Sequence, residues 1–356
     1  MREPLVEIKD LHVDFEVRDG TVHAIQGATF NINRGETTGV IGESGCGKSV
    51  TAKAIMQMIP KPGKITKGEV LYHYRDKLNP GQEEVVNISE LDPDGTRIRK
   101  IRGGEIGMIF QEPMSSLTPV YTAGFQIGEA LHIHRLIPAK VGDHMDKSIM
   151  EYRHVTKQEA REIAIDYLHK VGLPKPEERV DSYPHELSGG QRQRVMIAIA
   201  LSCDPVMLIA DEPTTALDVS IEAQILDLMR DLQETEDMAI MFITHNLGVV
   251  AEMAEDIIVM YMGKQVERSS AMNIFYEAKH PYTRALLQSI PHVGRREKER
   301  LASIKGMVPS PFNLPSGCVF HPRCPSFMPG KCDVIDPKWQ EVEEGHWVRC
   351  LLYEEV

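Results

Sequence analysis

Residues 42–49, Gly-Glu-Ser-Gly-Cys-Gly-Lys-Ser, have the composition and spacing of a loop that binds phosphate. Gly42 and Gly47 are separated by four residues and are followed directly by Lys48 and Ser49. Glycine allows the backbone to curl around an anion without a clash of Cβ atoms. We therefore expect Lys48 to reach the β- and γ-phosphates of a nucleotide, and Ser49 to bind Mg²⁺.

The residues on either side of this loop predict the elements that hold it in place. The apolar residues 39–41 are typical of the end of a buried strand, and residues 50–56 are typical of a helix. A helix that begins here directs its N–H groups and the positive end of its dipole toward one point. The predicted nucleotide-binding residues are Gly42, Ser44, Gly45, Cys46, Gly47, Lys48, Ser49 and Val50.

A second apolar stretch, residues 206–210, ends in the carboxylates Asp211 and Glu212. Strand ends on one edge of a parallel sheet converge on the place where ligands bind. Asp211 is therefore expected to hold Mg²⁺ through its water shell, and Glu212 to face an attacking water. An Asp-Glu pair after a strand is a weak indication by itself, and it gains weight from the loop at 42–49.

Composition narrows the class of protein. The chain has 356 residues, 42% apolar and 26% charged, which is ordinary for a globular protein with room for two domains. Its apolar runs fall short of the roughly 20 residues that a membrane span needs, and its first residues lack the apolar core of a secretory signal. We therefore expect cytoplasmic residence. The net charge of −12 argues against a nucleic-acid partner.

The order of predicted elements is that of an α/β protein with additions. Alternating apolar residues predict antiparallel strands within 5–41, and apolar spacing of three and four predicts a helix over 157–171. The polar stretch 75–97 is interpreted as a solvated insertion. The α/β pattern ends near residue 268. Further buried strands are predicted at 106–110, 206–210, 239–244 and 256–262.

Residues 187–191, Leu-Ser-Gly-Gly-Gln, resemble the signature motif of ATP-binding-cassette ATPases. The other motifs of that family follow in its order: Gln111 matches the Q-loop glutamine, Asp211 and Glu212 the Walker B pair, residues 216–218 the D-loop, and His245 the switch histidine. The resemblance implies an α/β P-loop NTPase cassette, with a RecA-like parallel-sheet core, an antiparallel β subdomain and a helical subdomain at about 114–190. It would occupy residues 1–268, and residues 269–356 would form a small cysteine-rich extension.

The resemblance also implies a role for each motif in the hydrolysis of ATP to ADP and phosphate. Ser49, Gln111 and Asp211 would hold Mg²⁺, Glu212 would act as general base, and His245 would contact the γ-phosphate. Ser188 and Gly190 would cover ATP bound on a partner subunit. Two ATPase subunits would thus bind ATP face to face and separate after hydrolysis.

Four stretches resemble the ATPase subunits of dipeptide and oligopeptide importers: residues 110–117, 210–219, 280–283 and 314–325. This resemblance implies an energy-coupling subunit at the cytoplasmic face of the cell membrane. Its partners would be two transmembrane permease subunits, a second ATPase subunit (a copy or a paralogue) and, indirectly, an extracytoplasmic solute-binding protein. Glu112 and Asn246 depart from the group, which usually has Asp there, and residues 137–154 look inserted.

Other functions fit parts of the pattern. A non-transport cassette ATPase acting in repair or translation commonly carries two cassettes, whereas this chain has one. A non-catalytic nucleotide-binding module is disfavoured by the presence of both Glu212 and His245. Importers that resemble this group also carry solutes such as oligosaccharides or nickel, so the sequence leaves the substrate open.

Four of the six cysteines crowd into the last 39 residues, with five, seven and seventeen residues between them: Cys318, Cys324, Cys332 and Cys350. Such a set can bind zinc or a [4Fe–4S] cluster, or stay as free or disulfide-bonded thiols. The spacing lacks the C-x₂-C pair that is usual for structural zinc. Because similar importer ATPases carry an iron–sulfur cluster here, the resemblance favours [4Fe–4S].

Overall fold

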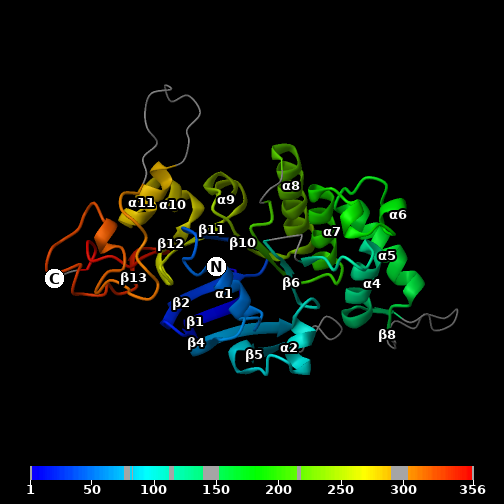
Figure 1. The fold of residues 1–356 in the computed structure, drawn as a ribbon, viewed down its shortest axis with the longest axis horizontal. Helices are drawn as coiled ribbons and strands as arrows, with labels where there is room; N and C mark the ends of the chain where they lie inside the picture. The colour runs from blue at the N-terminus through cyan, green and yellow to red at the C-terminus, as the bar shows by residue number, and fades with distance from the viewer. Residues whose placement is uncertain are drawn as a thin grey trace. The chain divides into compact units, whose positions relative to one another are not determined.

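The computed structural model describes residues 2–75, 81, 83–111, 116–138, 152–214, 218–289 and 304–354. By packing, the chain forms two compact units, residues 1–93 with 241–356 and residues 94–240 (Figure 1). The division falls within strand β10 (Ala239–Ile243). Among the described residues, no helix combines the length and the apolar character needed to cross a membrane.

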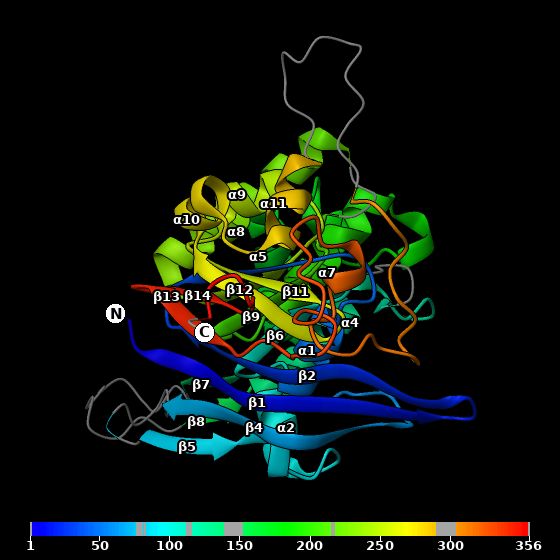
Figure 2. The same ribbon diagram turned by 90° about the vertical axis from the view of Figure 1, so that its left-hand side faces the viewer.

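An antiparallel sheet of four strands in the order β2-β1-β4-β5 forms one layer of the first unit (Figure 2). In it, Val6 pairs with Ile32 on one side and with Tyr72 on the other, and all three side chains are buried. The antiparallel strands predicted within 5–41 are thus confirmed. The strands are β1 (Pro4–Val17), β2 (Gly20–Asn33), β4 (Gly63–Arg75) and β5 (Glu83–Asn87).

Strand β5 corrects the interpretation of residues 75–97 as a solvated insertion. It pairs antiparallel with β4, and its Val86 is buried opposite Tyr72. This strand was hard to predict because Glu83, Glu84 and Val85 are exposed, as is common on an edge strand. The short helices that follow are η1 (Ile88–Glu90), in the first unit, and α2 (Thr96–Ile101), in the second.

The second layer of this unit contains five strands in the order β13-β14-β12-β11-β3. Strand β3 (Thr37–Ile41) is parallel to β11 (Asp256–Tyr261), with Ile41 opposite Val259, and every residue of β3 is buried. Strand β12 (Lys264–Ser270) pairs antiparallel with β11 and with β14 (His346–Val348), which pairs with β13 (Gln340–Glu343). The C-terminal segment therefore continues the same sheet.

Helices and irregular segments cover this layer. A core cluster brings together Val250, Ile257, Tyr282 and Phe320, so the cysteine-rich tail shares the core of the nucleotide-loop strands. Besides η1, the described helices of this unit are α1 (Lys48–Ile55), α9 (Leu247–Met253), α10 (Ala271–Glu277), α11 (Pro281–Gln288) and η3 (His321–Arg323).

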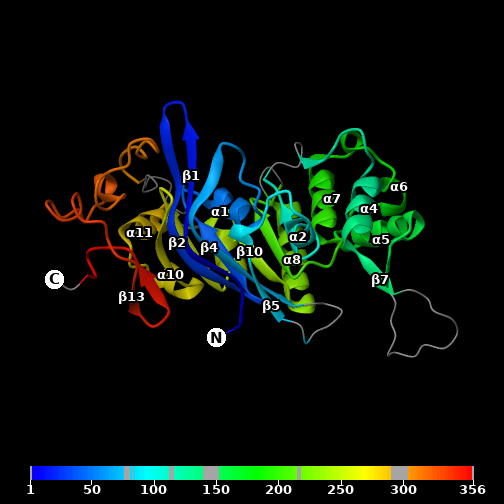
Figure 3. The same cartoon turned by 90° about the horizontal axis from the view of Figure 1, so that it is seen from below.

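The unit at 94–240 is mainly helical (Figure 3). Helix α5 spans Lys157–Lys170, as the apolar spacing predicts; Thr156 caps it reciprocally with Glu159, and it stops before Gly172 at φ +67°. Strands β6 (Ile106–Ile109) and β9 (Met207–Asp211) run parallel. The remaining elements are α4 (Ala123–His134), β7 (Leu136–Pro138), β8 (Tyr152–His154), α6 (Pro176–Arg179), η2 (Pro184–Glu186), α7 (Gly189–Leu201) and α8 (Val219–Glu236).

Candidate active site

The predicted phosphate loop lies between β3 and α1, where the sequence places it. Gly42 and Gly47 have φ values of +149° and +107°, which side chains rarely adopt. A Cβ atom at Gly42 would come within 2.2 Å of the Met260 carbonyl oxygen, and one at Gly47 within 2.6 Å of the Ala24 carbonyl oxygen. Both glycines are therefore required by conformation and by close packing.

Lys48 is buried with its ammonium over this loop. Its Nζ donates to the carbonyl oxygens of Gly42 at 2.7 Å and Glu43 at 3.1 Å, so loop and lysine fix one another. Ser44 and Gly45 lie exposed at the tip. Burial raises the pKa of the Cys46 thiol, which keeps it neutral. The loop thus presents one buried cation beside its backbone N–H groups, as binding of a phosphate anion requires.

Tyr282, for which no role was predicted from the sequence, also supports the phosphate loop. The backbone N–H of Glu43 donates to the Tyr282 hydroxyl at 2.8 Å, and Tyr282 is fully buried. Tyr282 stands in α11, whose first turn is capped by His280: its Nδ1 accepts from the backbone N–H of Tyr282 at 3.1 Å. Burial lowers the pKa of His280 to about 4, so the ring is neutral and can accept. Residues 280–283, one of the stretches that resemble the importer ATPases, therefore help to hold the phosphate loop in place.

Glu212 has a backbone conformation that is rare for a glutamate. Its φ is +50°, in the left-handed region, directly after the buried Asp211 that ends β9. Such a conformation costs on the order of 1–3 kcal/mol and is concentrated at functional sites. Gln111 Nε2 donates to Glu212 Oε2 at 3.1 Å, so two of the predicted catalytic side chains lie together.

The signature motif forms the N-terminus of α7. Ser188 is exposed and caps the helix: its Oγ accepts from the Gln191 backbone N–H, and Gln191 Oε1 accepts from the Ser188 backbone N–H. Gly190 packs against α8, since a Cβ there would come within 2.8 Å of Ile221 Cδ1. Asp218 caps α8 by accepting from the Ile221 N–H at 3.0 Å. The rest of the D-loop, 216–217, lies outside the described residues.

His245 follows β10 and is exposed, and Asn246 begins the next helix. The Asn246 side chain accepts from the Gly248 N–H at 3.1 Å, a cap that Asp provides equally well. This departure from the importer group therefore preserves the local structure. The other departure, Glu112, lies outside the described residues, as do most of residues 137–154. A single site for Lys48, Asp211 and His245 would join both units and stays a prediction.

The four tail cysteines lie close enough to affect one another's ionisation. Burial raises the pKa of Cys318 to about 11 and that of Cys350 to about 12, and the neighbouring thiols add to both shifts. The backbone N–H of Cys318 donates to the Cys332 carbonyl oxygen at 2.8 Å. Cys324 is half-buried, and burial likewise raises its pKa. Within the described ranges, no group of three or more His, Cys, Asp or Glu is arranged to hold a single metal ion.

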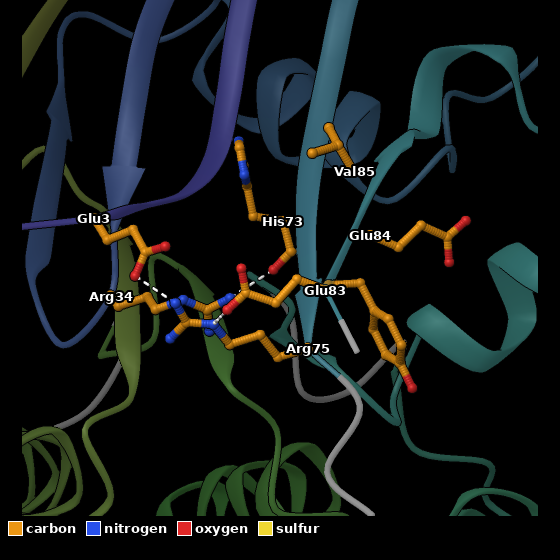
Figure 4. A pocket seen from close by; sticks show the side chains of 8 residues that line it. Glu3, Arg34, His73, Arg75, Glu83, Glu84 and Val85 are labelled. Carbon is orange, nitrogen blue, oxygen red and sulfur yellow. Dashed lines mark hydrogen bonds and ion pairs between the residues drawn. The ribbon is translucent and has the colours of Figure 1, made fainter. Parts of the chain in front are cut away.

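A small cavity of about 100 Å³ lies at the end of the antiparallel sheet, away from the phosphate loop (Figure 4). Arg75 in its wall pairs with Glu3 at 2.5 Å and with Glu83 at 2.7 Å. Arg34 Nη2 donates to the His73 carbonyl oxygen at 2.5 Å. Because the wall carries both charges and none of the motif residues, we assign the cavity no part in nucleotide binding.

Comparison with known proteins identifies the family and the fold. Residues 13–215 match the family model described as ABC transporter. The chain belongs to the ABC transporter family, and it is an ATPase of the cassette type. Residues 266–332 match a second model, the oligopeptide/dipeptide transporter C-terminal region. The predicted fold class, a P-loop NTPase cassette, is thereby confirmed.

Whole-chain relatives carry transport names. The oligopeptide transport ATP-binding protein AppD of Bacillus subtilis is 45% identical over 99% of this chain and 97% of its own. The dipeptide transport ATP-binding protein DppD of Escherichia coli is 42% identical over 97% of this chain and 96% of its own. A solved structure of the ATP-binding cassette MJ0796, a dimer bound to ADP and phosphate, is 28% identical with a TM-score of 0.59. It covers 75% of this chain and 98% of its own.

Proposed function

We propose that this chain is the ATP-hydrolysing, energy-coupling subunit of a membrane importer for dipeptides or oligopeptides. The observation that carries the proposal is the similarity to AppD over nearly both whole chains, extension included. The match of residues 266–332 to the peptide-transporter C-terminal region supports the same substrate class. A cassette ATPase of repair or translation has no comparable support.

The residues of the site divide between charge neutralisation and alignment of water. Lys48 and the N–H groups of residues 42–49 would bind the phosphates. Ser49, Gln111 and Asp211 offer the hard oxygen ligands that Mg²⁺ prefers, and the ion would neutralise charge on the transferred phosphoryl group. The strained Glu212 would take the proton of the attacking water, and His245 would contact the γ-phosphate.

Ser188 and Gly190 would act on the nucleotide of a second ATPase subunit. Ser188 is exposed at the N-terminus of α7, where the helix dipole favours negative charge. The dimeric state named for the MJ0796 cassette supports this pairing. The assembly would comprise two ATPase subunits at the cytoplasmic face of the membrane, two permease subunits, and a solute-binding protein outside.

The decisive experiment is co-expression with the two candidate permeases. We expect the chain to co-purify with both, and its ATPase rate in liposomes to rise when a peptide-loaded binding protein is present. Omission of the peptide and an oligosaccharide in its place serve as controls. Stimulation by the sugar alone would change the substrate class, and purification without permeases would refute the importer assignment.

We further propose that Cys318, Cys324, Cys332 and Cys350 bind a [4Fe–4S] cluster. The chemistry of the donor set supports this proposal, because four cysteines, three buried and one half-buried, lie in one short segment and none of them is in a disulfide. A backbone N–H group supports one of the sulfurs: that of Met328 lies 3.5 Å from Cys332 Sγ. Ligand bonds would contribute folding free energy to a segment with little regular structure.

Metal analysis of anaerobically purified protein tests this site. We expect a brown protein with about four irons per chain, as a [4Fe–4S] cluster requires. Stoichiometric zinc without iron would show that the four cysteines bind zinc and not an iron–sulfur cluster. Four titratable thiols in a folded extension, with neither metal, would refute both.

A further inference from the structure

The C-terminal extension is ionically joined to the phosphate loop. Arg323 Nη1 donates to Glu43 Oε2 at 2.6 Å, and Nη2 donates to Glu43 Oε1 at 3.0 Å, so the guanidinium and the carboxylate face each other along two parallel bonds. The Arg323 side chain is only 4% exposed and that of Glu43 27%. Bidentate, partly desolvated pairs of this kind are stronger and more directional than surface ion pairs.

The carboxylate, the backbone N–H and the carbonyl oxygen of Glu43 each have a hydrogen-bond partner. Its carboxylate accepts from Arg323, its backbone N–H donates to Tyr282, and its carbonyl oxygen accepts from Lys48 Nζ at 3.1 Å. The last contact connects the ion pair to the lysine that would bind the phosphates. A displacement of Glu43 would therefore move one of the acceptors that hold Lys48.

The ion pair also removes an electrostatic conflict. Glu43 is an acid within a loop that would bind a polyanion, and an unpaired carboxylate there would repel the phosphates. The guanidinium of Arg323 neutralises it at contact distance. Arg323 thus supplies a compensating charge to the carboxylate of the loop.

Arg323 is held by the cysteine segment itself. It ends η3, directly before Cys324 and five residues after Cys318. Its Nη1 also lies 3.2 Å from the Tyr261 hydroxyl, while Phe320 packs edge-on against Tyr261 at 5.2 Å between ring centroids. The direction of the guanidinium therefore depends on the fold of the segment between two proposed cluster ligands.

We propose that Arg323 is a positioning residue for the nucleotide site, through which the folded cysteine extension sets the affinity of the phosphate loop for MgATP. Intact, the extension holds Glu43 neutralised and in place. When the segment around Cys318 and Cys324 loses its fold, the guanidinium is withdrawn and the affinity falls. The proposal rests on the proposed function, because it concerns the same nucleotide site.

The test is a double-mutant cycle on the full chain, read as the dissociation constant for MgATP. Arg323→Ala should raise it about tenfold, within the range usual for coupled sites, with iron content unchanged. Arg323→Lys should restore part of the affinity, because it keeps the charge but loses one of the two bonds. The double variant with Arg323→Ala and Glu43→Ala should bind MgATP no more weakly than the weaker-binding of the two single variants. Arg349→Ala, which removes a guanidinium of the extension that binds carbonyl oxygens, is the matched control and should bind normally.

Each outcome has a separate meaning. Failure of the unmodified chain to bind MgATP, or normal binding by Lys48→Ala, would refute the proposed nucleotide site. If the nucleotide site itself behaves as proposed but Arg323→Ala binds MgATP with a dissociation constant within twofold of wild type, only the inference is overturned. The inference is likewise overturned if the effects of Arg323→Ala and Glu43→Ala multiply in the double variant. If Arg323→Ala does not fold, Arg323→Lys decides: unchanged affinity overturns the inference, and about threefold weaker binding supports it.

Discussion

The phosphate loop and the cysteine extension lie in one compact unit, but different parts of the chain hold them. The loop is formed by eight consecutive residues between a strand and a helix, and its shape depends on backbone conformation at Gly42 and Gly47. The extension depends on side chains that are distant in sequence, such as the pair of His346 with Glu267 at 2.8 Å, in which both side chains are fully buried.

This difference separates what each region contributes. The loop carries the N–H groups and the lysine that bind phosphate. The extension supplies no group for hydrolysis, and its side chains instead brace the loop through Tyr282 and Arg323. Chemistry should therefore be lost by changes in the cassette motifs, and affinity should be adjusted by changes in the extension.

Glu212→Gln should give the largest effect. Loss of the general base is expected to lower the ATPase rate about 10²–10⁴-fold, and loss of a charge near the γ-phosphate should leave MgATP binding intact and favour an ATP-bound dimer. Turnover assays with size-exclusion chromatography measure both. A rate within threefold of wild type would show that another residue takes the proton.

Lys48→Ala and Ser188→Arg should separate binding from assembly. Removal of the buried ammonium is expected to weaken MgATP binding by about a hundredfold or more, since loss of one partner of a desolvated charge pair is costly. Ser188→Arg should bind like wild type as a monomer but fail to hydrolyse ATP, because Ser188 would serve the partner's nucleotide. Equal loss of binding in both variants would contradict the geometry across subunits.

The same contrast explains how much the sequence could predict. Helix α5 was predictable because its spacing and its Thr156–Glu159 cap are local, and the phosphate loop because its glycines and Lys48 are consecutive. The ion pair of Arg323 with Glu43 spans 280 positions, and no local pattern marks it. The left-handed conformation of Glu212 is equally invisible, since most glutamates avoid it.

Acid should destabilise the extension at α11, which also carries the Tyr282 contact to the loop. The pKa of His280 is lowered by burial from 6.5 to about 4, so protonation favours the unfolded state. The contribution of neutral His280 to the free energy of unfolding is complete above pH 6.5. It falls as the pH drops toward 4, and about 2 kcal/mol of it is lost at pH 5. Burial alone would raise the pKa of Glu267, but hydrogen bonds, above all the one from His346, lower the pKa below its usual value of 4.5. The contribution of ionised Glu267 to the free energy of unfolding is therefore lost only below pH 4.5.

Hydrogen exchange in β12 and β14, corrected for intrinsic rates, measures this loss at pH 7 and pH 5. His280→Asn is the matched variant, because asparagine can still cap α11 but does not titrate. It should be less stable than wild type at pH 7 and should show a smaller difference between the two pH values. The same pH dependence in both proteins would assign the titration to another group.

Among the variants that lose affinity for the nucleotide, Cys332→Ser should show the smallest loss. Cys332 lies among the four thiols, so loss of its sulfur should remove iron and colour and loosen the segment that carries Arg323. Because the loop itself stays intact, MgATP binding should persist and weaken about fivefold to tenfold, in the lower part of the range for coupled sites.

Cys203→Ser is the control, since Cys203 is also a buried cysteine outside any disulfide but lies in the other unit, shortly after α7. It should keep its iron and its affinity. Introduced into Arg323→Ala, Cys332→Ser should weaken MgATP binding no further, because the path from the cysteines to Glu43 is already interrupted. A further tenfold loss there would mean that the extension acts on the loop by another route, with Tyr282 as the next contact to change.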